Sequence, residues 1–331
     1  MIYKPPGIIV TSKDVSTHTG ITLGLEQVIA TYIFAGGDDG IYRANIKDNI
    51  WHKMNDVTTV KQFLIVDTDM YAVGNLGVYK SINFGTTWTD ITGDLHSFNN
   101  LYSIIKINNT LYTVTANCVI YKSINEGINW VIVDNPADTA ICHLGYNGTT
   151  LFAGDTTNGI YKSIDGGDNW TQVLDLSGVW GVKITNIVSD KTIMWATGQS
   201  NGSGGGVWKS IDSGNNWSNV SPDSLSYISI SVVGDVVYCG NTSFQILKTI
   251  TGGASWTTPI STGLPLDFYP YALLSIGNSI LTGNGITNSR LDGIYQTIDG
   301  GNTWTLFNAG LQTDVISALT VMTALITILN N

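Results

Sequence analysis

Two kinds of side chain in this sequence have the chemistry for catalysis or ligand binding: loop carboxylates and grouped aromatic rings. Asp155 and Asp292 each lie in a stretch rich in Gly, Asn and Thr between apolar segments. A pair of carboxylates from different loops can supply the general acid and the nucleophile or base of a glycoside hydrolase. These two residues are therefore the candidate acid pair of an enzyme.

The aromatic candidates lie in two other polar stretches. Asp267, Phe268 and Tyr269 are consecutive within residues 258–271, and Trp180 ends the run Leu-Ser-Gly-Val-Trp. An aromatic ring can stack on the apolar face of a sugar while amide and carboxylate groups bond its hydroxyls. The sequence leaves open a structural role, in which the rings fill a channel or pack between repeated units and the acids are solvated turn residues. The candidate ligand contacts are Trp180, Asp267, Phe268, Tyr269, Asp155 and Asp292.

The elements that position these residues can be recognised from a repeated octet that ends in Trp. Each copy follows a short apolar run, such as Gly-Ile-Tyr-Lys at 159–162, and leads into a second strand-like run. This pattern predicts a hairpin loop between two β-strands. Six copies occupy residues 81–88, 123–130, 163–170, 210–217, 249–256 and 297–304, and a degenerate copy occupies 44–51.

Each residue type in the octet has a physical role in such a loop. The Ser163 hydroxyl and the Asp165 carboxylate can accept hydrogen bonds from N–H groups of the turn. Gly167 permits a positive φ, and Trp170 offers an apolar surface that locks the hairpin against its neighbour. An acid that recurs at one place in module after module favours a scaffold role over catalysis. The equivalent scaffold residues in two further copies are Ser210, Asp212, Trp217, Thr297, Asp299 and Trp304.

The spacing of the closing Trp residues predicts the architecture. They fall at 51, 88, 130, 170, 217, 256 and 304, at intervals of 37, 42, 40, 47, 39 and 48 residues. Such a period with four short strands per unit is typical of propeller blades. We predict an all-β fold, a single seven-bladed β-propeller with four-stranded antiparallel blades, closed by the N- and C-terminal strands. Residues 1–20 are expected to form an arm and 21–331 the propeller, with 21–25 and 325–329 as an extra strand or a partial eighth blade.

The octet resembles the Asp-box, or BNR repeat, of sialidases, xyloglucanases, the sortilin ectodomain and photosystem assembly factors. The resemblance covers almost the whole chain and implies a propeller with each box between the third and fourth strands of a blade, away from the binding face. Sialidases of this kind clamp their substrate with three Arg residues, whereas this chain has only Arg43 and Arg290. Xyloglucanases use an Asp pair between two propellers, and the photosystem factors carry a basic patch that this chain lacks.

The composition of the chain excludes further classes of partner. The net charge is −10 and only 12% of the residues are charged, which argues against nucleic acid and against an anionic membrane surface. The longest apolar stretch, residues 315–329, is too short to span a bilayer as a helix. The start of the chain shows no standard signal peptide, and the three Cys residues are expected as buried thiols. No cofactor is predicted, and no His, Cys and Asp cluster has metal-ligand spacing.

The sequence thus favours a non-catalytic recognition or structural propeller that is exposed on a cell or virion surface. Its partner would be a glycan or a protein, as for a lectin-like module or a phage tail or virion component, and it could belong to a larger assembly. The neutral surface rich in Asn, Thr and Gly is the basis for this expectation. The alternative is a glycoside hydrolase that uses two loop carboxylates.

Overall fold

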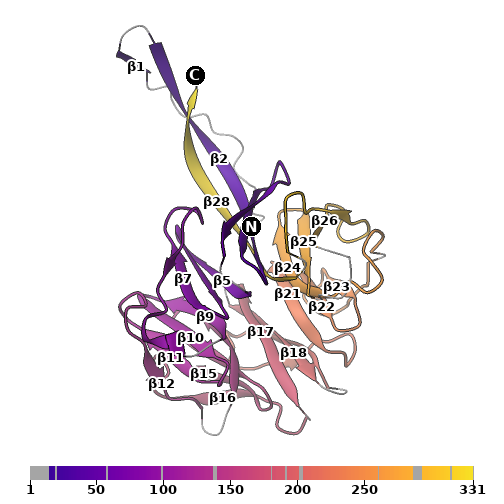
Figure 1. Cartoon of the computed structure of the whole chain (residues 1–331). Helices are drawn as coiled ribbons and strands as arrows, with labels where there is room; N and C mark the ends of the chain where they lie inside the picture. Colours follow the sequence, from indigo (N-terminus) through magenta and orange to yellow (C-terminus); the bar gives the residue numbers. More distant parts are fainter. Residues whose placement is uncertain are drawn as a thin grey trace.

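The computed structural model describes most of the chain, with gaps at both ends and in several loops. The described residues are 15–18, 21–56, 59–97, 100–136, 140–179, 181–190, 192–200, 204–259, 261–285, 293–313 and 315–330, of which 15–18, 21–29, 96–97 and 324–330 are described by backbone alone. In these ranges the fold is a seven-bladed propeller of antiparallel sheets with one short 3-10 helix, η1 (Gly93–Ser97) (Figure 1). The predicted all-β fold class and the number of blades are confirmed.

Blades 2 to 4 each contain four sequential strands. Blade 2 has β5 (Val60–Val66), β6 (Asp69–Gly74), β7 (Gly77–Ser81) and β8 (Thr89–Asp90). Blade 3 has β9 (Leu101–Ile107), β10 (Thr110–Thr115), β11 (Ile120–Ser123) and β12 (Val131–Val133). Blade 4 has β13 (Ile141–Asn147), β14 (Thr150–Asp155), β15 (Gly159–Ser163) and β16 (Thr171–Asp175).

Blades 5 to 7 continue this order around the ring. Blade 5 has β17 (Val182–Asp190), β18 (Ile193–Ser200), β19 (Gly206–Ser210) and β20 (Ser218–Asn219). Blade 6 has β21 (Tyr227–Val233), β22 (Val236–Asn241) and β23 (Ile246–Thr249), with its fourth strand reduced to a bridge between Lys248 and Thr257. Blade 7 has β24 (Pro270–Ile276), β25 (Ser279–Asn284), β26 (Ile294–Thr297) and β27 (Thr305–Leu306).

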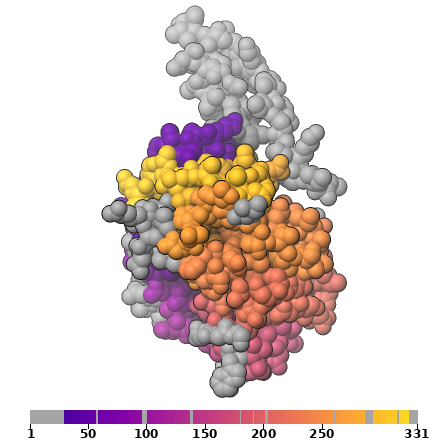
Figure 2. All heavy atoms as spheres, turned by 90° about the vertical axis from the view of Figure 1, so that its right-hand side faces the viewer, coloured from indigo at the N-terminus to yellow at the C-terminus, as the bar shows by residue number. Residues whose placement is uncertain are grey.

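Blade 1 closes the ring by joining the two ends of the chain. The C-terminal strand β28 (Ile316–Asn330) pairs with β2 (Ile21–Gly37), which is followed by β3 (Ile41–Asn45) and β4 (Trp51–Asn55). In Figure 2 the yellow C-terminal residues lie between the indigo residues of blade 1 and the orange residues of blade 7. The first half of β28 is therefore the innermost strand of blade 1, as predicted.

The segments 21–25 and 325–329 belong to these same two strands and form no eighth blade. The β2–β28 pairing runs on from Thr31↔Thr323 to Gly24↔Asn330, and β1 (Val15–His18) pairs with the start of β2. Figure 1 shows this two-stranded ribbon projecting from the propeller body. Of the predicted arm at 1–20, residues 1–14 and 19–20 lie outside the described ranges.

The core lies between blades, because each sheet buries one face against the next sheet. One cluster joins Tyr112 and Val114 of blade 3 to Leu144 and Leu151 of blade 4. The second strand of each blade is buried along most of its length, as the pattern of β14 shows. Burial on both faces explains why these strands read as continuous apolar runs and not as a clean alternation.

The Asp-box hairpins connect the third and fourth strands, as the sequence predicts. The Ser163 hydroxyl donates to Asp165 Oδ1 at 2.8 Å and accepts from the Gly167 N–H at 2.8 Å, and Asp165 Oδ1 accepts from the Asn169 N–H at 2.9 Å. Gly167 has a φ of 96°, in the region that favours glycine. The same pattern recurs at Ser210 with Asp212 and at Thr297 with Asp299.

The closing Trp residues differ in burial and in their hydrogen-bond partners. Trp51, Trp130 and Trp304 are buried, whereas Trp88, Trp170, Trp217 and Trp256 are only half-buried, so the apolar surface of the closing Trp is not covered to the same extent in every blade. The indole N–H groups of Trp51, Trp130, Trp170 and Trp256 donate to a backbone carbonyl of the preceding blade. Those of Trp88, Trp217 and Trp304 donate to the Gly carbonyl of their own box.

In blades 1 to 5 the cation just before the box contacts the box of the next blade. Lys209 Nζ, for example, donates to the Gly252 carbonyl at 2.8 Å. About a third of the basic residues of the chain therefore take part in contacts between neighbouring blades. The other such pairs are Arg43 with the Phe84 carbonyl, Lys80 with Glu126, Lys122 with Asp168 and Lys162 with Asn215.

Candidate functional site

The mouth of the central channel is built by one irregularity that all seven blades share. The pairing of the first two strands is interrupted in every blade by a β-bulge, where one residue of the innermost strand has no partner. A bulge bends its strand and re-aims the extra side chain. Every bulged residue lines one cavity at the channel mouth: Lys61, Tyr102, Cys142, Thr185, Ile228, Tyr271 and Ser317.

This cavity holds about 230 Å³ and continues into a deeper one of about 150 Å³. Lys61, Gln62, Asn186, Tyr271 and Ser317 line both, so the two form one passage. The innermost strands begin here, on the face opposite the Asp-box hairpins. A volume below the usual range for drug-sized ligands fits one small group, such as a single sugar ring or a short side chain.

Basic and amphipathic groups give the mouth its chemistry. Lys183 lies above the Tyr102 ring with its Nζ 5.5 Å from the ring centroid, in a cation–π arrangement. Burial, with a further contribution from Lys183, lowers the pKa of Lys61 below its ordinary value. Burial and the charge of Lys183 also lower the pKa of His143 to about 4, so this imidazole is neutral at pH 7. Among the described residues that line the passage there is no carboxylate.

Two amides in the wall are fixed by hydrogen bonds to neighbouring blades. The Gln62 side-chain carbonyl accepts from the Ile104 N–H at 2.8 Å. Asn186 donates to the Thr197 hydroxyl and to the Ile228 carbonyl, both at 3.0 Å. These bonds hold both side chains in place without using all of their polar atoms, since a primary amide has two donors and an acceptor.

Three aromatic rings extend from the mouth across blades 6 and 7. Tyr271 is 39% exposed and stacks on Tyr269, with 6.3 Å between ring centroids. Tyr269 in turn meets Phe244 edge to face at 6.0 Å, and Phe244 is itself 45% exposed. Together Tyr271, Tyr269 and Phe244 form an exposed aromatic strip beside the cavity, a surface on which an apolar ligand face can stack.

The predicted cluster at 267–269 is divided by the structure. Tyr269 belongs to the aromatic strip, and Asp267 is exposed in the loop before β24. Phe268 is only 1% exposed and packs edge to face on Tyr295 at 5.3 Å, so its ring is part of the core. This is the structural alternative that the sequence left open for the aromatic residues.

Asp155 is fully buried and its carboxylate holds together two loops. One oxygen accepts from the Ala140 N–H at 2.7 Å, and the other from the N–H groups of Thr157 and Asn158. Asn284 takes the same position in blade 7 and accepts from the Tyr269 N–H. The contacts of Asp155 thus serve the fold. Trp180 and Asp292 lie outside the described residues, and their ligand contacts stay predictions.

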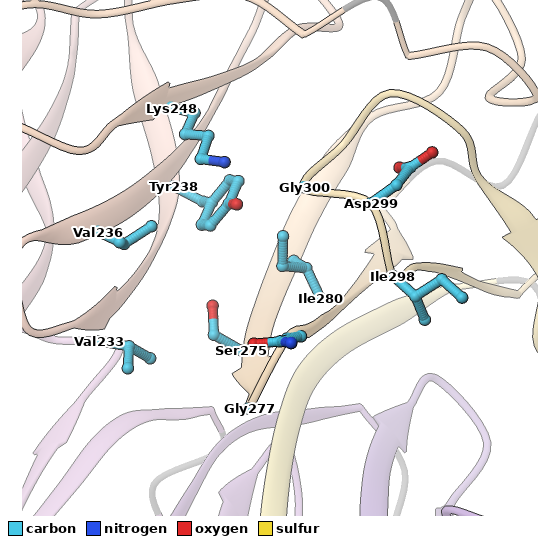
Figure 3. A pocket seen from close by; sticks show the side chains of 11 residues that line it. Val233, Val236, Tyr238, Lys248, Ser275, Gly277, Ile280, Ile298, Asp299 and Gly300 are labelled. Atoms are coloured by element: carbon cyan, nitrogen blue, oxygen red, sulfur yellow. The ribbon is translucent and has the colours of Figure 1, made fainter. Parts of the chain in front are cut away.

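A larger cavity of about 350 Å³ opens between blades 6 and 7 on the Asp-box side, where Lys248 points in from blade 6 (Figure 3). Ser275 and Gly300 line it from blade 7. At the junction of blades 2 and 3 the equivalent positions carry Lys106 and Glu126, which form an ion pair at 2.7 Å. The cavity between blades 6 and 7 therefore exists because Ser275 and Gly300 are too small to fill this junction. We favour the channel mouth as the candidate site.

Other chemical groups contribute little to a site in the described ranges. Cys142 and Cys239 are buried free thiols, as predicted, whereas Cys118 is half-buried. Within these ranges no three His, Cys, Asp or Glu residues gather in a way that could hold a metal ion. In the same part of the chain, no helix has the length and apolar character needed to cross a membrane.

The comparisons with solved structures agree on the fold. The chain resembles the GH74 enzyme of Niastella koreensis with a TM-score of 0.67 at 18% identity, over 87% of this chain and 52% of that one. It resembles YCF48 bound to D1 peptide with a TM-score of 0.56 at 14% identity, over 88% of this chain and 87% of that one. It also resembles the extracellular domain of a putative one-component system from B. thetaiotaomicron, with a TM-score of 0.59 at 12% identity, over 85% of this chain and 38% of that one.

The chain therefore spans about half the length of the GH74 enzyme, and identities this low show the fold alone. No curated protein matches the sequence. These likenesses are those expected of an Asp-box propeller. The model of the DUF6242 β-propeller domain matches residues 47–312, which is most of the chain, and the protein belongs to this family.

Proposed function

We propose that the protein is a non-catalytic recognition propeller that binds its ligand at the channel mouth. The observation that carries the proposal is the convergence of the seven bulged residues on one cavity beside the aromatic strip. The scaffold repeats from blade to blade, whereas these seven side chains are basic, aromatic, polar and apolar in turn. A set of different side chains on a rigid ring is suited to specific binding.

The ligand is a glycan or a protein segment that is met on a cell or virion surface, as for a lectin-like module or a phage tail component. Exposed aromatic rings next to fixed amides suit a sugar ring and its hydroxyls. Two likenesses support such a role: YCF48, whose structure contains a bound peptide, and an extracellular domain of a putative one-component system. The net charge of −10 argues against nucleic acid as the partner, and we expect no insertion into a membrane.

A glycoside hydrolase is the second candidate, because the chain resembles a GH74 enzyme. Such an enzyme needs two carboxylates around the scissile bond. The Asp155 carboxylate is buried and already accepts four hydrogen bonds. The described lining of the channel mouth supplies lysines, amides and rings in place of acids, which favours binding over hydrolysis.

A glycan array probed with the wild-type chain and with Tyr271→Ala tests the proposal. The matched control is Ile298→Ala, a change of an exposed residue on the Asp-box face of the same blade. We expect the wild type and the control to bind the same sugars, Tyr271→Ala to lose them, and a reducing-end assay to detect no product. Turnover that Asp155→Asn or Asp292→Asn abolishes would instead establish the hydrolase.

A further inference from the structure

We propose that the channel mouth binds the carboxylate of an acidic saccharide between Lys61 and Lys183. This inference rests on the proposed function and narrows its ligand to sugar acids of the uronate class. It assigns the carboxylate to the two lysines and the sugar ring to the aromatic strip. Tyr271, which lines the cavity and belongs to the strip, joins the two parts.

The first observation is that two cations share one small space without an anion. Lys61 extends from β5 of blade 2 and Lys183 from β17 of blade 5, and both line the cavity of about 230 Å³. Within the described ranges neither forms an ion pair or a hydrogen bond through its ammonium group. The two are close enough for the charge of Lys183 to lower the pKa of Lys61.

Such an arrangement costs stability in the empty protein. Lys61 is half-buried, which removes water from its ammonium group, and the charge of the exposed Lys183 nearby adds repulsion. Several other lysines of this chain are paired with acids: Lys80 and Lys106 pair with Glu126, and Lys122 pairs with Asp168. In a protein with a net charge of −10, two lysines kept apart from every described carboxylate form a local site for an anion.

The second observation is an extension of blade 5 that brings Lys183 to the mouth. In the other blades the bulge follows the first strand pair directly, whereas in blade 5 the pairs Val182↔Ser200 and Lys183↔Gln199 precede it. The added pairs raise Lys183 and Gln199 above the bulged Thr185 and place both in the cavity wall. The extension therefore adds one cation and one amide to this site.

The remaining wall favours a sugar acid over a simple inorganic anion. The Gln199 and Asn186 side chains and the Ser317 hydroxyl line the passage beside the lysines, and each can bond a sugar hydroxyl. Tyr271 offers a ring face at the edge of the same cavity. The small volume fits a single terminal ring, so we infer recognition of the non-reducing end or a side branch and not of an internal stretch.

Calorimetric titration with tri-galacturonate and tri-glucuronate, each compared with its methyl ester, tests the inference. The ester keeps the ring and the hydroxyls and removes the charge. We expect at least one of the two free acids to bind, its ester to bind about 10- to 100-fold more weakly, and Lys61→Gln and Lys183→Gln to cause a similar loss. Lys47→Gln is the control, because it removes the same charge from an exposed position on the octet of blade 1.

A thermal melt without ligand checks that the lysines serve binding and not folding. Lys61→Gln removes a half-buried charge that forms no ion pair within the described residues. We therefore expect the melting temperature of this variant to stay the same or rise, and that of Lys47→Gln to stay unchanged. A drop in melting temperature for Lys61→Gln, together with acid binding that survives the change, would overturn the inference.

The outcomes separate this inference from the proposed function. Binding of neutral glycans that is sensitive to Tyr271→Ala and insensitive to both lysine changes would overturn the acid subsite and leave the recognition module standing. A peptide such as Gly-Gly-Glu binding through the same lysines, with no affinity for either sugar acid, would overturn the saccharide assignment. No binding of any sugar, acidic or neutral, would contradict a glycan ligand altogether.

Discussion

A Cβ atom built on Gly167 would lie 2.3 Å from Cγ1 of Val133, so the Asp-box of blade 4 touches blade 3 at a point where only glycine fits. The same relation holds at other junctions, for Gly85 against Phe34 and for Gly214 against Phe152. The box glycine thus has two functions: it permits a positive φ in the hairpin, and it allows the hairpin to approach the preceding blade. The boxes are joints between blades as well as turns within them.

Gly167→Ala is therefore expected to destabilise more than a glycine change that affects φ alone. Gly148→Ala is the matched control, since Gly148 also has a positive φ, 64°, and nothing lies within 4 Å of its Cβ position. Gly148→Ala should lower the free energy of unfolding by about 1–2 kcal/mol, because alanine disfavours the left-handed conformation. Gly167→Ala should cost about 1–3 kcal/mol more, for overpacking against Val133. Urea unfolding of both variants gives the comparison, and equal losses would show that the contact between blades is not tight.

The two modes of Trp packing predict unequal costs of truncation. Trp304 is 4% exposed, and its indole N–H bonds the carbonyl of Gly301 within its own box. Trp170 is half-buried and bonds the Asp134 carbonyl of the preceding blade. We expect Trp304→Ala to cost about 3–5 kcal/mol, the usual range for a buried aromatic side chain, and Trp170→Ala to cost less. A Trp170→Ala variant that unfolds at the lower denaturant concentration of the two would contradict this order.

The box carboxylates predict how stability depends on pH. Side-chain and backbone N–H groups of Asn169 lower the pKa of Asp165 to about 2 from its ordinary 3.8, and Asp212 and Asp299 are lowered in the same way. The folded state binds protons at these three carboxylates more weakly than the unfolded state does. The stabilisation of the fold by the ionised carboxylates is therefore complete above pH about 4 and is lost as the pH falls through about 2. Asn125 shows that an amide fits the box, since its Oδ1 accepts from the Asn129 N–H at 3.0 Å.

A triple variant with Asn at 165, 212 and 299 should therefore fold and lose part of this pH dependence. We expect the melting temperature of the wild type to exceed that of the variant near pH 6, and the gap to narrow between pH 4 and pH 2. Melting curves across this range test the expectation. A gap that stays constant down to pH 2 would mean that the box carboxylates do not respond to pH as their hydrogen bonds imply.

The scaffold could be predicted because it repeats. Ser163, Asp165, Gly167 and Trp170 recur with the same spacing in other blades, and one local hydrogen-bond pattern explains each copy. The burial of the individual closing Trp residues could not be predicted, because it depends on the preceding blade and not on the octet. Trp170 meets the end of β12, and Trp304 meets its own turn.

The bulged residues that line the channel mouth could not be predicted from the sequence, for a physical reason. Lys61, Tyr102 and Lys183 lie near the start of innermost strands, and strand alternation alone does not say which of their side chains face the channel. A β-bulge shifts that alternation by one residue, so the pattern before the bulge contradicts the pattern after it. A usable signal was present: the residues near the start of each first strand differ from blade to blade, whereas the octets stay the same.

The candidate residues in the sequence lie in or next to predicted loops, which usually carry binding sites. Tyr269 lies in the aromatic strip and stacks on Tyr271, the last residue of the same segment 258–271. Phe268 and Asp155 are buried parts of the fold, although they also come from connecting segments. Phe268 and Tyr269 are neighbours in one loop, yet only the Phe268 ring is in the core, so a position in a loop does not predict whether a ring is exposed.

A crystal structure of the chain with the strongest ligand from the glycan array tests the central claim most directly. The account predicts electron density for a sugar at the channel mouth, with its ring on Tyr271 and, for an acid, its carboxylate between Lys61 and Lys183. Ligand density between blades 6 and 7 beside Lys248, or on the Asp-box face, with an empty channel mouth, would contradict it.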